Sequence, residues 1–88
     1  MASKFFYVYV LRSRKDGHSY TGYTHDLRQR LHLHQSGAVE STRDRLPVEL
    51  IYYEACQHQQ DATRREKYLK SAWGKRYLKS RLRNYLTG

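Results

Sequence analysis

Cysteine, proline and long apolar runs are all scarce in this 88-residue chain. The single cysteine, Cys56, has no second cysteine with which to form an internal disulfide, so we expect the protein to work in the reducing cytoplasm. No apolar run approaches the roughly 18 to 20 residues needed to span a bilayer, which predicts no membrane partner. These shortages exclude a disulfide-stabilised secreted scaffold and a membrane-spanning protein.

Acidic side chains are also in short supply. The chain has 8 Asp and Glu against 17 Lys and Arg, which gives a formal net charge of +9. An isoelectric point near 9.9 is typical of a small domain that binds nucleic acid. A basic surface that is only solvated, with no specific partner, is the alternative at this point. The length predicts one domain over residues 1–88, because a second core would need roughly 50 residues more.

The apolar patterns predict an α+β fold, with a small antiparallel three-stranded sheet flanked by helices in the order β-β-α-β-α-α. The first strand is apolar on both faces, which indicates the centre of the sheet. The expected strands are residues 4–11, 18–24 and 48–54. The first expected helix is capped by Thr24 or Asp26 and runs to about Ser36. Two further helices are expected over residues 61–73 and 75–86.

Two glycines mark local features of these elements. Gly22, inside the second predicted strand, indicates a bulge or the close approach of another part of the chain. Gly74 is expected to end the helix over residues 61–73. The apolar stripe of that helix is predicted to contain Ala62, Leu69 and Trp73.

One group of residues indicates a catalytic site. The predicted hairpin carries the motifs Tyr7-Val8-Tyr9 and Tyr20-Thr21-Gly22, and the helix after it places Arg30 and His34 four residues apart on one face. Glu66 lies on the apolar stripe of the next helix, where a carboxylate is costly unless something pairs with it. Basic residues attract phosphate, and a lone carboxylate can hold a cation, so this combination predicts metal-assisted phosphodiester hydrolysis.

These motifs resemble those of the GIY-YIG nuclease superfamily, and most closely its small single-domain bacterial members, which resemble the nuclease domain of the excision-repair incision enzyme. Tyr7-Val8-Tyr9 stands where the family has Gly-Ile-Tyr, and Tyr20-Thr21-Gly22 where it has Tyr-Ile-Gly. The resemblance covers residues 6 to about 80. One departure is Tyr7, which replaces the first glycine. Further matching segments are residues 23–31, Thr42-Arg43, residues 45–54 and residues 65–70.

The resemblance implies a role for each residue of the group. Tyr9 corresponds to the proposed general base for the attacking water, and Tyr20 to a tyrosine that orients that water and the phosphate. Arg30 corresponds to the arginine that stabilises charge on the phosphate, and His34 to a histidine that relays or positions a proton. Glu66 corresponds to the single carboxylate ligand of Mg²⁺ or Mn²⁺. A nearby cation favours a phenolate, which is a better base than a phenol at neutral pH.

Without the family resemblance, each of these five residues also fits an ordinary structural position. The tyrosines fit a half-buried sheet, the arginine fits a solvated helix face, and the histidine fits a surface position near a helix end. Glu66 also fits a capping box that begins at Thr63, although Asp61 offers an earlier cap. The proposed chemistry requires all five side chains to share one hollow.

Two functions follow from this pattern. The first is a metal-dependent endonuclease that acts on DNA, with a role in repair or recombination. The second is a nucleic-acid-binding module that has the nuclease fold but cleaves little or not at all. A third reading, a protein-interaction domain, predicts that Tyr9, Arg30 and Glu66 do not converge. Substrate choice is expected to come from the loop over residues 37–46, from the last helix or from a partner protein. The expected nucleic-acid contacts are Arg43, Arg45, Lys75, Arg76 and Lys79.

Overall fold

The computed structural model describes residues 4–88 and confirms the α+β fold. The three strands form an antiparallel sheet in the order β2-β1-β3, so the strand with two apolar faces is central, as its pattern predicts. The elements are β1 (Phe6–Ser13), β2 (Ser19–Thr24), α1 (Leu27–Gln35), η1 (Arg43–Arg45), β3 (Val48–Cys56), α2 (Gln59–Lys70), α3 (Ala72–Arg81) and α4 (Arg83–Thr87).

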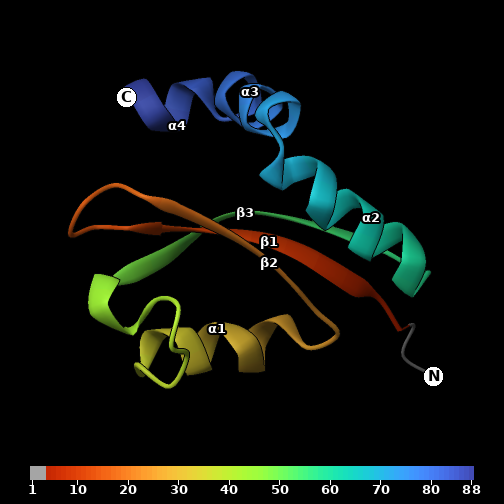
Figure 1. The fold of residues 1–88 in the computed structure, drawn as a ribbon, viewed down its shortest axis with the longest axis horizontal. Helices are drawn as coiled ribbons and strands as arrows, with labels where there is room; N and C mark the ends of the chain where they lie inside the picture. Colours follow the sequence, from red (N-terminus) through yellow and green to blue (C-terminus); the bar gives the residue numbers. More distant parts are fainter. Residues whose placement is uncertain (1–3) are drawn as a thin grey trace.

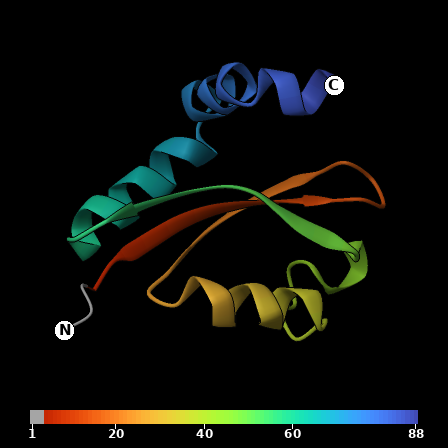
Figure 2. The same ribbon diagram turned by 180° about the vertical axis from the view of Figure 1, so that it is seen from behind.

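Helices cover both faces of the sheet (Figures 1 and 2). Helix α1 lies against one face, and α2 with the C-terminal helices lies on the other. Alternate residues of β1 serve the two sides: Val8 and Val10 pack with α2 and α3, whereas Tyr9 and Leu11 pack with α1. Within residues 4–88, no helix has the length and apolar character needed to cross a membrane.

The predicted boundary between the last helices is wrong. Helix α2 ends at Lys70, Ser71 caps the next helix, and Gly74 lies inside α3 instead of ending α2. A Cβ on Gly74 would lie 2.0 Å from the carbonyl oxygen of Tyr68, so the glycine allows α3 to cross close to the end of α2. Trp73 is correspondingly 67% exposed and is not part of the core. The predicted helix over residues 75–86 is divided between α3 and α4.

Helix α2 is fixed to the sheet by Arg65. Its guanidinium donates to Glu54 on β3 through Nε and Nη2, with shortest distances of 2.9 Å. The rings of Tyr68 and Tyr77 lie 5.0 and 4.8 Å from the guanidinium carbon, so two cation–π contacts flank the ion pair. This anchor sets the position of the neighbouring Glu66.

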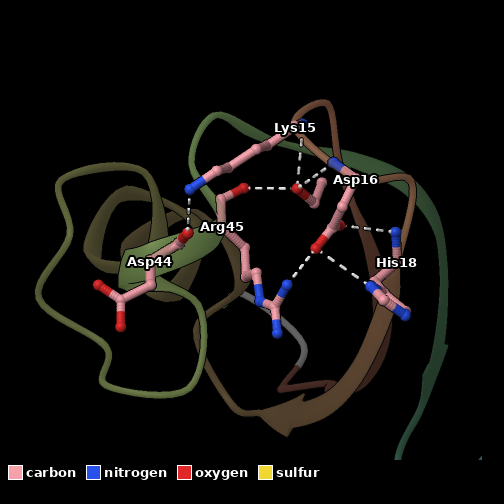
Figure 3. Close-up of polar contacts among 6 residues, drawn as sticks. Lys15, Asp16, His18, Asp44 and Arg45 are labelled. Atoms are coloured by element: carbon pink, nitrogen blue, oxygen red, sulfur yellow. Dashed lines mark hydrogen bonds and ion pairs between the residues drawn. The ribbon is translucent and has the colours of Figure 1, made fainter.

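A second polar cluster attaches the loop before β3 to the turn between β1 and β2 (Figure 3). The Ser13 hydroxyl donates to the carbonyl oxygen of Arg45 at 2.6 Å, and the guanidinium of Arg45 pairs with Asp16. Lys15 donates through Nζ to the carbonyl oxygen of Asp44 at 3.2 Å, whereas the Asp44 carboxylate points away from the cluster. The loop is therefore held at several points, which matters because it also carries a buried part of the site described below.

Gly22 marks a close approach, one of the two features that its place in a strand indicates. It pairs with Tyr9 across the β1–β2 ladder. A Cβ on Gly22 would lie 2.4 Å from the Tyr9 hydroxyl oxygen, closer than any real contact of a Cβ. The side chain of Tyr9 therefore occupies the space that a side chain at Gly22 would need.

We expect Gly22→Ala to lower the free energy of unfolding by about 1 to 3 kcal/mol, the usual cost of overpacking a filled site. Tyr9 is 3% exposed and packs with Leu11 and Val48, and displacement of its ring would disturb this packing. Urea denaturation measures the stability, and NMR shifts of the Tyr9 ring report its displacement. Ser19→Ala, at an exposed position of the same strand, is the control. A Gly22→Ala protein with wild-type stability and an unmoved Tyr9 ring would contradict the close approach.

The Asp16 carboxylate predicts a pH-dependent contribution to stability. The backbone N–H of His18, the His18 ring and, to a smaller extent, Arg45 hold the pKa of Asp16 well below its ordinary value of 3.8. The stabilisation is therefore complete above pH 4 to 5 and is lost as the pH falls below the unfolded-state pKa towards the lower folded-state pKa. We expect Asp16→Asn to be less stable than wild type at pH 7, with the difference shrinking below pH 4.

Denaturant unfolding between pH 7 and pH 2 measures this difference. Asp44→Asn is the matched control, because Asp44 contributes only its backbone carbonyl to the cluster. A stability difference between wild type and Asp16→Asn that stays constant over this pH range would disprove the linkage.

Candidate active site

Four side chains from β1, α1 and the following loop form one hydrogen-bonded network. The Tyr9 hydroxyl oxygen lies 2.9 Å from Nε2 of His34, and Arg30 Nε donates to the same oxygen at 3.3 Å. On the other side of the imidazole, Nδ1 lies 2.7 Å from Oγ1 of Thr42. Tyr9, His34 and Thr42 are 3%, 4% and 0% exposed, so most of this network is shielded from solvent.

Local structure explains how these residues meet. Asp26 caps α1 by accepting from the backbone N–H of Gln29, and the helix ends at Gln35, close to the predicted limits. The four-residue spacing then points Arg30 and His34 at the same tyrosine, as predicted for one helix face. The sequence alone also allowed both side chains to be exposed to solvent, but neither of them is. Arg30 is half-buried and His34 is buried.

Burial affects the charge state of the histidine. Removal from solvent, with a smaller effect from the positive charge of Arg30, lowers the pKa of His34 below its ordinary value of 6.5. The imidazole is therefore neutral at neutral pH and has one N–H donor and one nitrogen acceptor. The charged group at the Tyr9 oxygen is the guanidinium of Arg30.

A hollow of about 670 Å³ extends from this network around the edge strand β2 towards α3. Tyr9, Tyr20 and His34 line one part of it. The other part combines an apolar floor that includes Ile51 and Leu78 with three lysines: Lys70, Lys75 and Lys79. Tyr20 is thus close to the Tyr9–His34 pair, and an anion in the hollow would meet positive charge from α2 and α3.

Glu66 occupies a different position from the other four candidates, so the five side chains do not share one hollow as the sequence predicted. It lies in the middle of α2, which begins at Gln59 and is capped by His58, so it does not form a capping box with Thr63. Helix α2 packs on the face of the sheet opposite to Tyr9, and the Glu66 carboxylate pairs with Nζ of Lys70 at 2.9 Å. Glu66 is not among the residues that line the hollow, whereas its ion-pair partner Lys70 is.

The carboxylate nevertheless has the chemistry that a divalent cation requires. Mg²⁺ binds through one or two carboxylates and keeps several water ligands. The Glu66 side chain is 21% exposed, so it remains accessible to a hydrated ion. Within residues 4–88, no three His, Cys, Asp or Glu side chains gather as a metal cluster. A cation here would be held by one carboxylate and water, in exchange for the Lys70 contact.

The basic residues predicted to contact nucleic acid fall into two groups. Arg45 pairs with Asp16, and Arg43 Nη2 lies 3.9 Å from a carboxylate oxygen of Glu40, so acidic partners offset both charges. Lys75 and Lys79 face the hollow, and Arg76 stacks on the Trp73 ring at 5.0 Å. The α3 residues therefore lie closer to the candidate site than the loop arginines.

Two residues of the site were given no role from the sequence, although Thr42-Arg43 is one of the segments that match the family. Thr42 is a single hydroxyl in a polar loop, and no periodic pattern distinguishes it from its exposed neighbours Ser41 and Arg43. Its burial depends on the anchoring of that loop by the β1–β2 turn, which is a long-range contact. The sequence does contain a signal for Lys70, because it lies four residues after Glu66 and this spacing predicts an ion pair on a helix.

Comparisons with known proteins agree with this architecture. The GIY-YIG catalytic domain matches residues 5–83. A UPF0213 protein of Streptococcus agalactiae serotype V is 48% identical over 65 residues, which are 73% of each chain. A UPF0213 protein of Clostridium perfringens is 42% identical over 65 residues, 73% of this chain and 69% of the relative. The solution NMR structure of a UPF0213 protein from Bacillus halodurans is 38% identical, with a TM-score of 0.55, and the match covers 86% of this chain and 83% of that one.

The names of these relatives state no activity. The family itself implies a nuclease-like fold and a nucleic acid substrate, and its nucleases are generally metal-dependent. The match over residues 5–83 includes Tyr9, Arg30, His34 and Glu66. This chain is a member of the GIY-YIG family, in the small single-domain group to which the UPF0213 proteins belong.

Proposed function

We propose that the protein is an endonuclease that hydrolyses phosphodiester bonds in DNA with the help of Mg²⁺ or Mn²⁺, and that it serves DNA repair or recombination in the cytoplasm. The observation that carries this proposal is the buried network in which Arg30 and His34 both contact the Tyr9 hydroxyl. The network lies beside a hollow whose far side carries three lysines, which suits a polyanionic substrate.

Tyr9 would act as the general base. Its phenolate oxygen would take a proton from a water molecule, whose oxygen attacks phosphorus while the bond to the leaving oxygen breaks. The N–H of Arg30 at 3.3 Å favours negative charge on the Tyr9 oxygen. The guanidinium would also stabilise the negative charge that builds up on the phosphate during attack. Tyr20, on the wall of the same hollow, would orient the water and the phosphate.

Glu66 would hold the cation, which when bound supplies positive charge for the phosphate oxygens. A single carboxylate with water ligands suits Mg²⁺ or Mn²⁺ better than a metal that needs several nitrogen or sulfur ligands. For the carboxylate to serve Tyr9, the substrate must reach around β2, because α2 lies on the other face of the sheet. The hollow extends along part of this path, as far as Lys70, the ion-pair partner of Glu66.

We expect the purified protein to cleave supercoiled, single-stranded or branched DNA in Mg²⁺ or Mn²⁺ and to stop when EDTA is added. Tyr9→Phe should reduce the rate by about 10²- to 10⁴-fold, because the general base is removed. Glu66→Gln should reduce it by a similar factor and should raise the cation concentration needed for half-maximal rate. Gel assays of the cleaved products measure these rates.

Two variants serve as matched controls. Tyr53→Phe removes a hydroxyl from the residue paired with Tyr9 on β3, which is 53% exposed. Glu40→Gln removes an acidic charge from a side chain that is 90% exposed. Cleavage that is equally fast in wild type, Tyr9→Phe and Glu66→Gln would identify a contaminating nuclease and exclude the proposal.

A second function, a nucleic-acid-binding module with little or no cleavage, is favoured by one specific contact. Lys70 neutralises Glu66 at 2.9 Å, which competes with a cation for the same carboxylate. The same lysine belongs to the positive wall of the hollow. DNA binding by wild-type protein, without cleavage in any of the cations, would support this function over the nuclease.

Both functions predict salt-dependent binding through α3. We expect the double variant Lys75→Gln/Lys79→Gln to weaken DNA binding and to reduce the slope of log K against log salt by roughly 1.4 to 1.8, since each phosphate contact contributes about 0.7 to 0.9. Fluorescence anisotropy at several salt concentrations measures this slope. Lys67→Gln, at an exposed position of α2 outside the hollow, is the control. An unchanged slope in the double variant would place the binding surface elsewhere.

A further inference from the structure

Thr42 lies at the far end of the network from the candidate base. Its side chain is wholly buried, with 0% exposure, although it comes from a loop whose neighbouring residues are exposed. Its Oγ1 lies 2.7 Å from Nδ1 of His34. Among residues 4–88, the Thr42 hydroxyl has no hydrogen-bond partner other than this nitrogen. A buried hydroxyl donor without an acceptor costs free energy, so the direction of this bond can be worked out from the whole network.

Only two arrangements of protons are compatible with a neutral imidazole. If Nδ1 carries the proton and donates to Thr42, the Thr42 hydroxyl proton has no acceptor, because Thr42 is wholly buried and does not line the hollow. If Nε2 carries the proton, the Thr42 hydroxyl donates to Nδ1, and the Nε2–H donates to the Tyr9 oxygen. In this second arrangement the hydroxyl proton of Tyr9 is directed to the hollow that Tyr9 lines, where water or substrate accepts it.

We propose that Thr42 is a positioning residue that holds the proton of His34 on Nε2 and directs it to the oxygen of Tyr9. The Tyr9 oxygen then receives two N–H donors, Nε2–H from His34 and Nε–H from Arg30. Two donors to one phenol oxygen stabilise the phenolate that the proposed general base requires, in the way that donors stabilise an oxyanion. In this arrangement His34 does not remove the Tyr9 proton, which leaves through the hollow. This inference rests on the proposed function and assigns His34 a specific protonation state within it.

The fold supplies independent support, because the loop is anchored where Thr42 needs to be held. The Thr42 backbone N–H donates to Val39 at 3.2 Å, and its carbonyl accepts from the backbone N–H of Arg45 at 2.9 Å. Arg45 is in turn tied to the β1–β2 turn by Ser13 and Asp16. The groups that face His34 are Tyr9 from β1, Arg30 from α1 and Thr42 from this loop, and the burial and Arg30 effects described above keep the imidazole neutral.

The protonation state of His34 can be measured directly by ¹⁵N NMR of the imidazole in protein free of DNA and metal. Signals of His34 are identified by their loss in His34→Gln. We expect wild type and Thr42→Ser to show one form, with Nε2 protonated and Nδ1 unprotonated. Thr42→Val, which has nearly the same shape but no hydroxyl, should show a mixture of the two forms, because nothing then holds the proton on Nε2.

Cleavage assays provide a second readout. We expect Thr42→Val to lower the rate by roughly 10- to 100-fold, by analogy with the loss of hydrogen-bond partners that orient metal-ligating histidines. Thr42→Ser should restore most of the rate. A wild-type histidine protonated on Nδ1, or a Thr42→Val spectrum identical to that of wild type, would overturn the inference. Because the NMR experiment needs no catalysis, an inactive wild-type protein with the expected spectra would reject the nuclease proposal while supporting the role of Thr42.

Discussion

The contact between the Tyr9 hydroxyl and the imidazole of His34 is the interaction on which the candidate site depends. It joins the central strand of the sheet to α1, and it is possible because Gly22 on the neighbouring strand has no side chain. Burial of both residues excludes most of the water that would otherwise compete for the hydroxyl. The geometry of the site thus depends on the absence of a Cβ at Gly22 as much as on the chemistry of its polar groups.

The surrounding fold supports this contact from two directions. Leu11 and Val48 pack with Tyr9 beneath α1, which holds the tyrosine ring, and the cluster around Asp16 and Arg45 holds the loop behind the imidazole. The carboxylate of Glu66 is positioned by other forces, through the attachment of α2 to β3 by Arg65. The tyrosine network and the Glu66 carboxylate are therefore stabilised separately, on opposite faces of the sheet.

Local patterns predicted most of the fold but only part of the site. The two-sided alternation in β1 and the four-residue spacing of Arg30 and His34 express local geometry, so the structure agrees with both. The prediction for Gly74 was wrong because this glycine does not end a helix. It allows α3 to pass close to Tyr68, and that contact depends on tertiary packing. The burial of Thr42 could not be predicted for the same reason, since its loop is held by the ion pair between Arg45 and Asp16, which are 29 residues apart in the chain.

The placement of α1 and α2 on opposite faces of one thin sheet has an evolutionary consequence. Residues that surround the phenol and those that surround the carboxylate share few neighbours, so a substitution near one of them changes the other little. The charge and length of α3 and α4 can therefore change without disturbing the tyrosine, its histidine or the carboxylate. A scaffold of this kind can acquire new targets by altering these last two helices alone.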